Sequence, residues 1–156
     1  MQAPTHFLTG ILIQKTLTTL FPMIHPVLSG IIVFIATFLS HFLVDAFAKI
    51  TYHVPDARPE DKFWLGYHIF IYLLTIALLI VFLNTYWIAI LGSVFIDVID
   101  WGILRGLLKK EPYIHPIIDK FREKCFSWLP DLIEEKWTVI NEFIILGLLF
   151  TAMFFL

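Results

Sequence analysis

Hydrophobic residues are gathered into long blocks along this chain, and short polar stretches separate the blocks. Five apolar blocks run at about 6–20, 27–49, 63–84, 86–107 and 132–156. A helix of roughly 20 apolar residues is long enough to cross the hydrocarbon core of a bilayer. The pattern therefore predicts an all-α, polytopic membrane helix bundle with about five membrane segments, forming a single domain over residues 1–156. The first block is short and is followed by Pro22 and Pro26, so a tilted or partly re-entrant helix is an alternative there.

The composition agrees with a membrane protein. Of the 156 residues, 59% are hydrophobic, sixteen are Phe and five are Trp, and the mean hydropathy is +0.84. A soluble domain of this size has too little interior to bury so much apolar surface. The formal net charge is only -2, and the basic residues lie beside the apolar blocks, so nothing here points to nucleic acid as a partner.

The basic residues predict the orientation of the chain. The connections at 21–26 and 84–86 contain no Lys or Arg, whereas 49–62 contains three and 105–124 contains six. Loops rich in Lys and Arg remain on the cytoplasmic side of a membrane. We therefore expect a multi-pass protein of the cell (inner) membrane, with its N-terminus and both basic connections in the cytoplasm and its C-terminus outside.

Segment 111–128, between the fourth and fifth blocks, has an amphipathic pattern. Helical spacing places its larger apolar residues on one side. These residues are Ile117, Ile118, Phe121, Cys125 and Trp128. The pattern predicts a helix that lies in the cytoplasmic membrane interface.

Three of the apolar blocks carry polar residues at helical spacing, which places them on one face of each helix. Such a face is not expected to point at lipid. The residues are Thr37, His41, Asp45 and Lys49 in the second block, His68, Tyr72 and Thr75 in the third, and Ser93, Asp97 and Asp100 in the fourth. At about 1.5 Å per residue, His41 and Asp97 each lie roughly 12 Å from the basic end of their helix. The three faces therefore meet at a similar depth in the cytoplasmic leaflet, where five of the six histidines also fall.

Histidine and aspartate together form the ligand set that proteins use for zinc, manganese, iron or nickel. Asp97 and Asp100 are one helical turn apart in apolar surroundings, so their charges repel unless a cation or a proton lies between them. A bound divalent metal would compensate the two negative charges. We expect zinc or manganese. The alternative is that His41 and Asp45 form a hydrogen-bonded pair that joins helices. Glu142, inside the last block, is expected either to reach the interface or to pair with the first helix.

Several short motifs resemble those of a known family. They are Pro4-Thr5-His6-Phe7-Leu8-Thr9-Gly10, Ser40-His41 followed by Asp45, and Gly92-Ser93 followed by Asp97-Val98-Ile99-Asp100. They are similar to motifs of the inner-membrane metal-dependent hydrolases, a family described as LexA-binding, membrane-associated hydrolases. The resemblance implies metal ligands at His6, His41, Asp45, Asp97 and Asp100, with His68 and His115 as additions. The chain has Ile96-Asp97 in place of the family's Pro-Asp and lacks its His-Arg-Gly-x-Thr-His signature.

We therefore expect a metal-dependent hydrolase with a cytoplasm-facing site that acts on a lipid or a phosphorylated substrate. In this hypothesis Asp45 is a ligand or orients His41, and His68 or His115 acts as the catalytic acid or base. One alternative is a non-catalytic subunit that packs against other membrane proteins or against a second copy of itself. Another is a small proton or ion carrier that uses the same acids.

Overall fold

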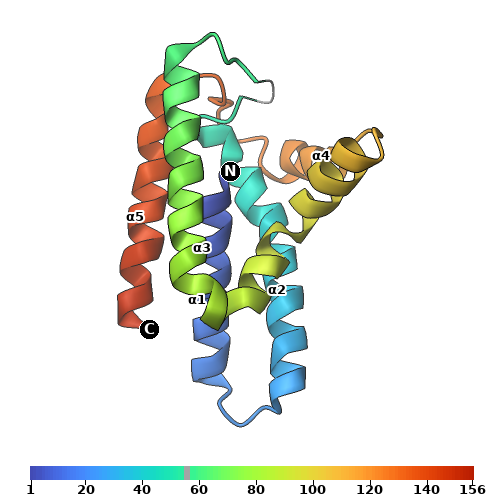
Figure 1. Cartoon of the computed structure of the whole chain (residues 1–156), viewed down its shortest axis with the longest axis vertical. Coiled ribbons are helices and arrows are strands. Elements are labelled where there is room, and N and C mark those ends of the chain that lie inside the picture. The colour runs from blue at the N-terminus through green and yellow to red at the C-terminus, as the bar shows by residue number, and fades with distance from the viewer. Residues whose placement is uncertain (55–56) are drawn as a thin grey trace.

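The computed structural model describes residues 1–54 and 57–156, and within these ranges it contains helices and no β-strand. This confirms the predicted all-α class. Figure 1 shows the helices standing side by side as a bundle, with α1 in the middle and α4 projecting at one end. The α-helices are α1 (Ala3–Leu20), α2 (Pro26–Ala46), α3 (Lys62–Asp97), α4 (His115–Cys125) and α5 (Val139–Phe155). Shorter helical segments are the 3-10 helices Phe47–Ile50 and Lys136–Thr138 and the π-helical segment Val98–Leu107.

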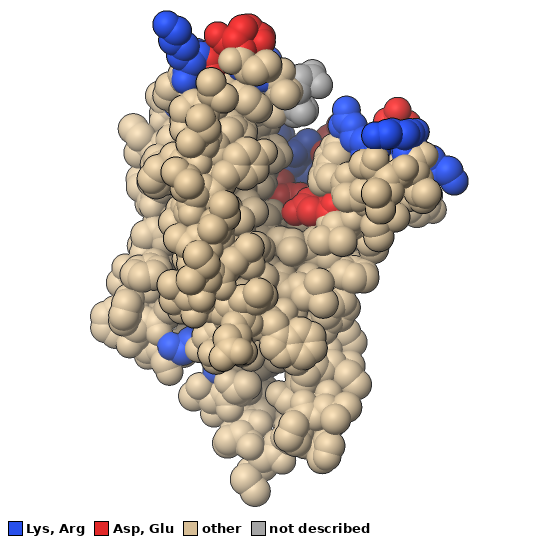
Figure 2. Space-filling view, viewed as in Figure 1, with Lys and Arg blue, Asp and Glu red and all other residues tan. Residues whose placement is uncertain are grey.

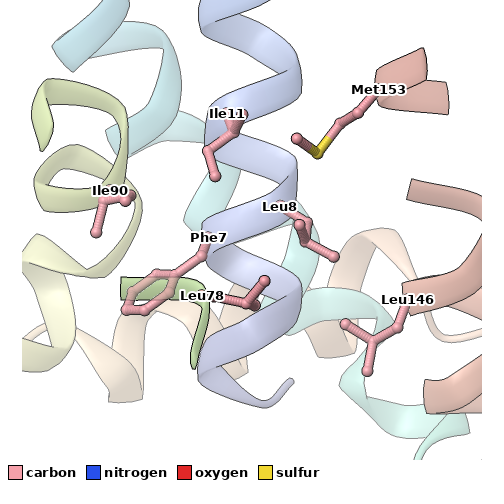
Figure 3. Packing of buried hydrophobic residues seen from close by; sticks show 7 residues of the cluster. All are labelled: Phe7, Leu8, Ile11, Leu78, Ile90, Leu146 and Met153. Carbon is pink, nitrogen blue, oxygen red and sulfur yellow. The ribbon is translucent and has the colours of Figure 1, made fainter. Parts of the chain in front are cut away.

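The main hydrophobic core surrounds α1. Figure 3 shows side chains of α1 between those of α3 and α5. The buried members are Phe7, Leu8, Ile11, Leu78, Ile90, Leu146 and Met153. Because α1 packs against α2, α3 and α5, its first half buries polar as well as apolar residues. His6 is one of these buried polar residues.

Three helical stretches are long and apolar enough to cross a membrane: Pro26–Ile50, Lys62–Leu107 and Lys136–Phe155. Their outward faces expose large apolar side chains such as Ile80 and Leu148, which is unfavourable in water and favourable against lipid. The structure therefore supports a membrane protein. The count of five crossings stays a prediction.

The stretch Lys62–Leu107 is bent back on itself. It contains 46 residues and would be roughly 69 Å long if it were one straight helix. Tyr86 has non-helical backbone angles, with φ -119° and ψ 25°, and Figure 1 shows the chain reversing within α3, at the lowest point of that helix in the view. The break lies at the predicted connection 84–86. The reversal returns residues 87–107 to the end of the bundle where α2 finishes.

Two glycines allow the helices to approach closely. A Cβ atom on Gly92 would overlap the hydroxyl of Thr37 and lie 2.9 Å from the Phe34 carbonyl oxygen, and one on Gly10 would lie 2.8 Å from the Ala89 carbonyl oxygen. The small residues thus bring α1 and α2 against the second part of α3.

Two ion pairs join the connection 49–62 to the segment that precedes α5. In the connection 49–62, Arg58 and Asp61 form ion pairs with Glu134 and Lys136, at 3.1 and 2.6 Å. Residues 55 and 56 of this connection lie outside the described part of the chain. Helix α4 is shorter than the predicted amphipathic segment, and Ile118 is the buried residue on it.

Candidate metal centre

Four segments that are distant in the sequence bring histidines and aspartates together at one end of the bundle. His6 lies near the start of α1, His41 and Asp45 lie near the end of α2, Asp97 ends α3, and His115 begins α4. They form two overlapping groups whose candidate ligand atoms lie within 4.8 Å of one another. One group is His6, His41 and Asp45, and the other is His41, Asp97 and His115.

His41 lies in both groups, and its ring orientation is fixed. Its side chain is fully buried, and its Nδ1 lies 2.7 Å from the backbone carbonyl oxygen of Ser93. A carbonyl oxygen only accepts hydrogen bonds, so Nδ1 carries the hydrogen and the neutral ring has a lone pair on Nε2. That Nε2 lies 3.2 Å from Asp45 Oδ2 and 3.8 Å from Asp97 Oδ1. A lone pair directed at two carboxylates is repelled by them unless a proton or a metal ion lies between.

His115 reaches the same point from the opposite side. Its Nδ1 lies 2.8 Å from Asp100 Oδ2, and its Nε2 lies 3.2 Å from Asp97 Oδ1 and 3.7 Å from Asp45 Oδ2. The indole N–H of Trp101 donates to the same Nε2 at 3.2 Å, a hydrogen bond that an ion bound at Nε2 would replace. Burial lowers the pKa of His115, but its hydrogen bonds with Asp97 and Asp100 outweigh burial, and the net pKa is raised above 6.5. The carboxylates thus favour positive charge at this position.

His6 completes the cluster through Asp45. Its Nε2 lies 3.1 Å from Asp45 Oδ1, which also accepts a hydrogen bond from the amino group of Met1 at 2.7 Å. The rings of His6 and His41 are stacked, with 4.2 Å between their centroids. Asp45 therefore uses one oxygen toward His6 and the other toward His41.

The spacing of these atoms suits a small divalent ion. A tetrahedral ion with bonds of about 2.1 Å holds its ligand atoms roughly 3.4 Å apart. The separations from Asp97 Oδ1 to His41 Nε2 and His115 Nε2 are 3.8 and 3.2 Å, which lie on either side of that value. Ordinary charged hydrogen bonds are shorter, at about 2.7–2.9 Å. The donor set and its spacing therefore fit zinc or a similar ion.

Asp100, predicted as a ligand, lies outside both groups. It is fully buried and accepts hydrogen bonds from the backbone N–H groups of Tyr113, Ile114 and His115 at 3.1, 2.8 and 2.7 Å. With the bond to His115 Nδ1 it accepts four. Asp100 thus holds the start of α4 and orients the imidazole of His115, as carboxylates commonly do for metal-binding histidines.

His68, predicted as a catalytic acid or base, is not brought to this cluster. Its ring stacks on Trp64 with 4.0 Å between centroids, and its Nδ1 lies 2.8 Å from the Trp64 carbonyl oxygen. The contact is local to α3, and His68 belongs to neither group.

The cluster lies in an open recess. Figure 2 shows acidic side chains in a hollow between the main body of the bundle and the projecting part that contains α4. Basic side chains lie on that projecting part. The recess has a volume of about 570 Å³, and Asp45, Asp97 and His115 are among its lining residues. The side chains of Asp97 and His115 are 34% and 17% exposed, whereas His6 and His41 are buried. The candidate ligand atoms of Asp97 and His115 can therefore be reached from the recess.

Several lining residues were not predicted from the sequence as site residues. They are His53, Trp101, Arg105 and Arg122. Burial lowers the pKa of His53 to about 3, so this imidazole is neutral at physiological pH. His53 lies in a polar connection, where a histidine is not unusual. The arginines were explained by the orientation of the chain in the membrane. No local pattern in the sequence therefore marked these residues as part of a site.

Comparison of the chain with family models, with curated proteins and with solved structures finds no match. The resemblance to the membrane hydrolases therefore stays a prediction.

Proposed function

We propose that this chain is a multi-pass membrane protein that binds a divalent metal, zinc or manganese, and uses it to hydrolyse a lipid or phosphorylated substrate at the cytoplasmic face. The observation that supports this most strongly is His41. Its hydrogen bond to Ser93 leaves the Nε2 lone pair facing the carboxylates of Asp45 and Asp97 in a fully buried position.

A metal accounts for this arrangement better than protons alone. Stacked rings 4.2 Å apart cannot both be charged without strong repulsion, so protonation can relieve either His6 or His41. A divalent ion bound by neutral imidazoles compensates two carboxylates at once. His41 and His115 also come from different helices, and ion binding explains why they converge on Asp97.

His41, Asp97 and His115 are the ligands in this proposal. Catalytic metal sites keep one position open to water or substrate, and this group faces the recess through Asp97 and His115. A divalent ion held here would polarise a phosphoryl or carbonyl oxygen and lower the pKa of a water molecule. Asp45 lines the same recess, and its Oδ2, 3.2 Å from His41 Nε2, could accept a hydrogen bond from that water, while His6 and the amino group of Met1 hold its other oxygen.

Metal content and hydrolysis are tested on the same preparations. We expect the purified protein to bind about one zinc or manganese per chain and to hydrolyse at least one ester in a panel of phosphorylated and carboxylic lipids. His41→Ala and Asp97→Asn should lose both properties. His68→Ala is the matched control, because it removes a histidine of the same bundle outside the cluster, and it should retain them. Equal metal content in His41→Ala and His68→Ala, or metal binding with no hydrolysis, would overturn the proposal.

A further inference from the structure

We propose that the recess binds the phosphate group of the substrate, with Arg105 and Arg122 as the residues that recognise it. This inference rests on the proposed metal centre and names the substrate class for it. Both arginines line the same recess as Asp97 and His115. A phosphate in this recess could therefore contact the arginines and the metal together.

Arg105 is held in place by an aromatic ring. It lies in the π-helical segment Val98–Leu107, with its guanidinium carbon 5.2 Å from the centre of the Trp101 ring. That distance is within the range of a cation–π contact. The indole nitrogen of Trp101 also lies 3.2 Å from His115 Nε2, so this aromatic side chain lies against both the arginine and the candidate ligand.

Arg122 approaches from α4. It follows His115 by seven residues, so the two lie on the same helical face. Its guanidinium forms an ion pair with Asp119 at 2.6 Å, and Asp119 also lines the recess. This pair uses one nitrogen of a group with five N–H donors, which leaves donors for a second anion.

The charges of the lining make anion binding depend on the metal. Asp45, Asp97 and Asp119 contribute three negative charges, and Arg105, Arg122 and the amino group of Met1 contribute three positive ones. The sum is therefore -3 + 3 = 0, and a divalent ion changes it to +2. An anion is attracted more strongly to the positive recess than to the neutral one, so phosphate is expected to bind more tightly after the metal.

Phosphate fits these groups better than a carboxylate does, because a carboxylate has only two oxygens. The planar fork of a guanidinium can occupy two oxygens of either group, and only phosphate then has further oxygens that can face the metal. The other lining residues include the apolar Ala48, Val54 and Ile118, and Trp101 is 42% exposed at the edge. The phosphate can therefore belong to a lipid or to a soluble ester, and the experiment separates these sources.

Isothermal titration of the zinc-loaded protein in detergent tests the inference with two ligands that share a head group. Short-chain phosphatidic acid and glycerol 3-phosphate both carry a phosphate monoester, and only the former carries acyl chains. We expect binding to the zinc-loaded protein and at least a tenfold weaker affinity for the metal-free protein. Binding of phosphatidic acid alone would assign a lipid phosphate, and equal binding of both would assign the phosphate group itself.

Variants that each remove one positive charge test whether Arg105 and Arg122 bind the phosphate. Arg105→Gln and Arg122→Gln should each weaken binding about tenfold or more, while Lys120→Gln and Lys124→Gln should not, because those residues lie in the same region without lining the recess. Full zinc content in each variant shows that it is folded. If the zinc-loaded protein binds neither ligand, or if arginine and lysine variants behave alike, the phosphate inference is wrong while the metal centre stands.

Discussion

Asp100 shows how one buried carboxylate can prepare a site without belonging to it. It accepts three backbone N–H groups at the start of α4 together with the Nδ1–H of His115. The first three bonds fix where α4 begins, and the fourth selects the tautomer whose Nε2 lone pair faces Asp97. One residue therefore sets both the position and the chemistry of His115.

Replacing this carboxylate should weaken the metal site without removing a ligand. In Asp100→Asn, the amide nitrogen cannot accept the hydrogen bonds that a carboxylate oxygen accepts, so His115 loses its fixed orientation. We expect zinc affinity to fall by about 10- to 100-fold, measured by competition with a chelating dye, with the helical circular dichroism unchanged. An affinity equal to that of the wild-type protein would show that Asp100 does not orient His115.

At the scale of elements, the site depends on how closely α2 and α3 approach. Gly92 lies against Thr37, and its neighbour Ser93 provides the carbonyl that fixes His41. The π-helical segment that follows α3 separates Asp97 from Asp100, so that the first faces His41 and the second faces α4. Irregular helical turns of this kind are frequent at functional sites.

Gly92→Ala should disturb both packing and metal binding. The added methyl group would overlap Thr37, and overpacking of this kind costs about 1–3 kcal/mol. We expect a lower midpoint of thermal unfolding in detergent and a reduced zinc content. Gly147→Ala, in α5, is the matched control because no atom lies within 4 Å of its added carbon. Equal midpoints for the two variants would contradict the proposed close contact between α2 and α3.

On the scale of the whole molecule, the apolar surface and the charged surface are separated. Large apolar side chains cover the sides of the bundle, while the recess and most Lys and Arg residues lie at one end (Figure 2). A bilayer around the apolar sides would leave the recess at the interface on the basic side, which the positive-inside rule places in the cytoplasm. The substrate would then be reached from the inner leaflet or the cytoplasm.

This orientation can be tested with the single cysteine. Cys125 is exposed on α4, and Met23, in the opposite turn, is 95% exposed. We expect a membrane-impermeant maleimide to label Cys125 only after cells are opened. In a Cys125→Ser background, Met23→Cys should be labelled in intact cells. The reverse pattern would place the recess outside, and labelling of both sites in intact cells would contradict the two-sided arrangement.

The sequence predicted the helical class and much of the cluster because these depend on local spacing. His41 and Asp45 share a face of one helix, and the depth of Asp97 matched theirs. Glu142 was expected to reach the interface or to pair with the first helix, and it accepts a hydrogen bond from Thr5 of α1. These inferences used only the periodicity of a helix and the fact that burying an unpaired charge is unfavourable.

Other features depended on the tertiary structure. The same periodicity grouped Asp100 with Asp97, because an uninterrupted α-helix was assumed where the chain is π-helical. It also placed His68 on a polar face, although that ring packs against Trp64. The recess is formed when α4 returns over the end of the bundle, so Arg105 and Arg122 could not be recognised as its lining from the sequence.

X-ray absorption at the zinc edge of the loaded wild-type protein tests the metal centre most directly. We predict nitrogen and oxygen ligands at about 2.0–2.1 Å, with the outer-shell scattering of two imidazoles. A shell of oxygen alone, or a sulfur ligand at about 2.3 Å from Cys125, would contradict this prediction.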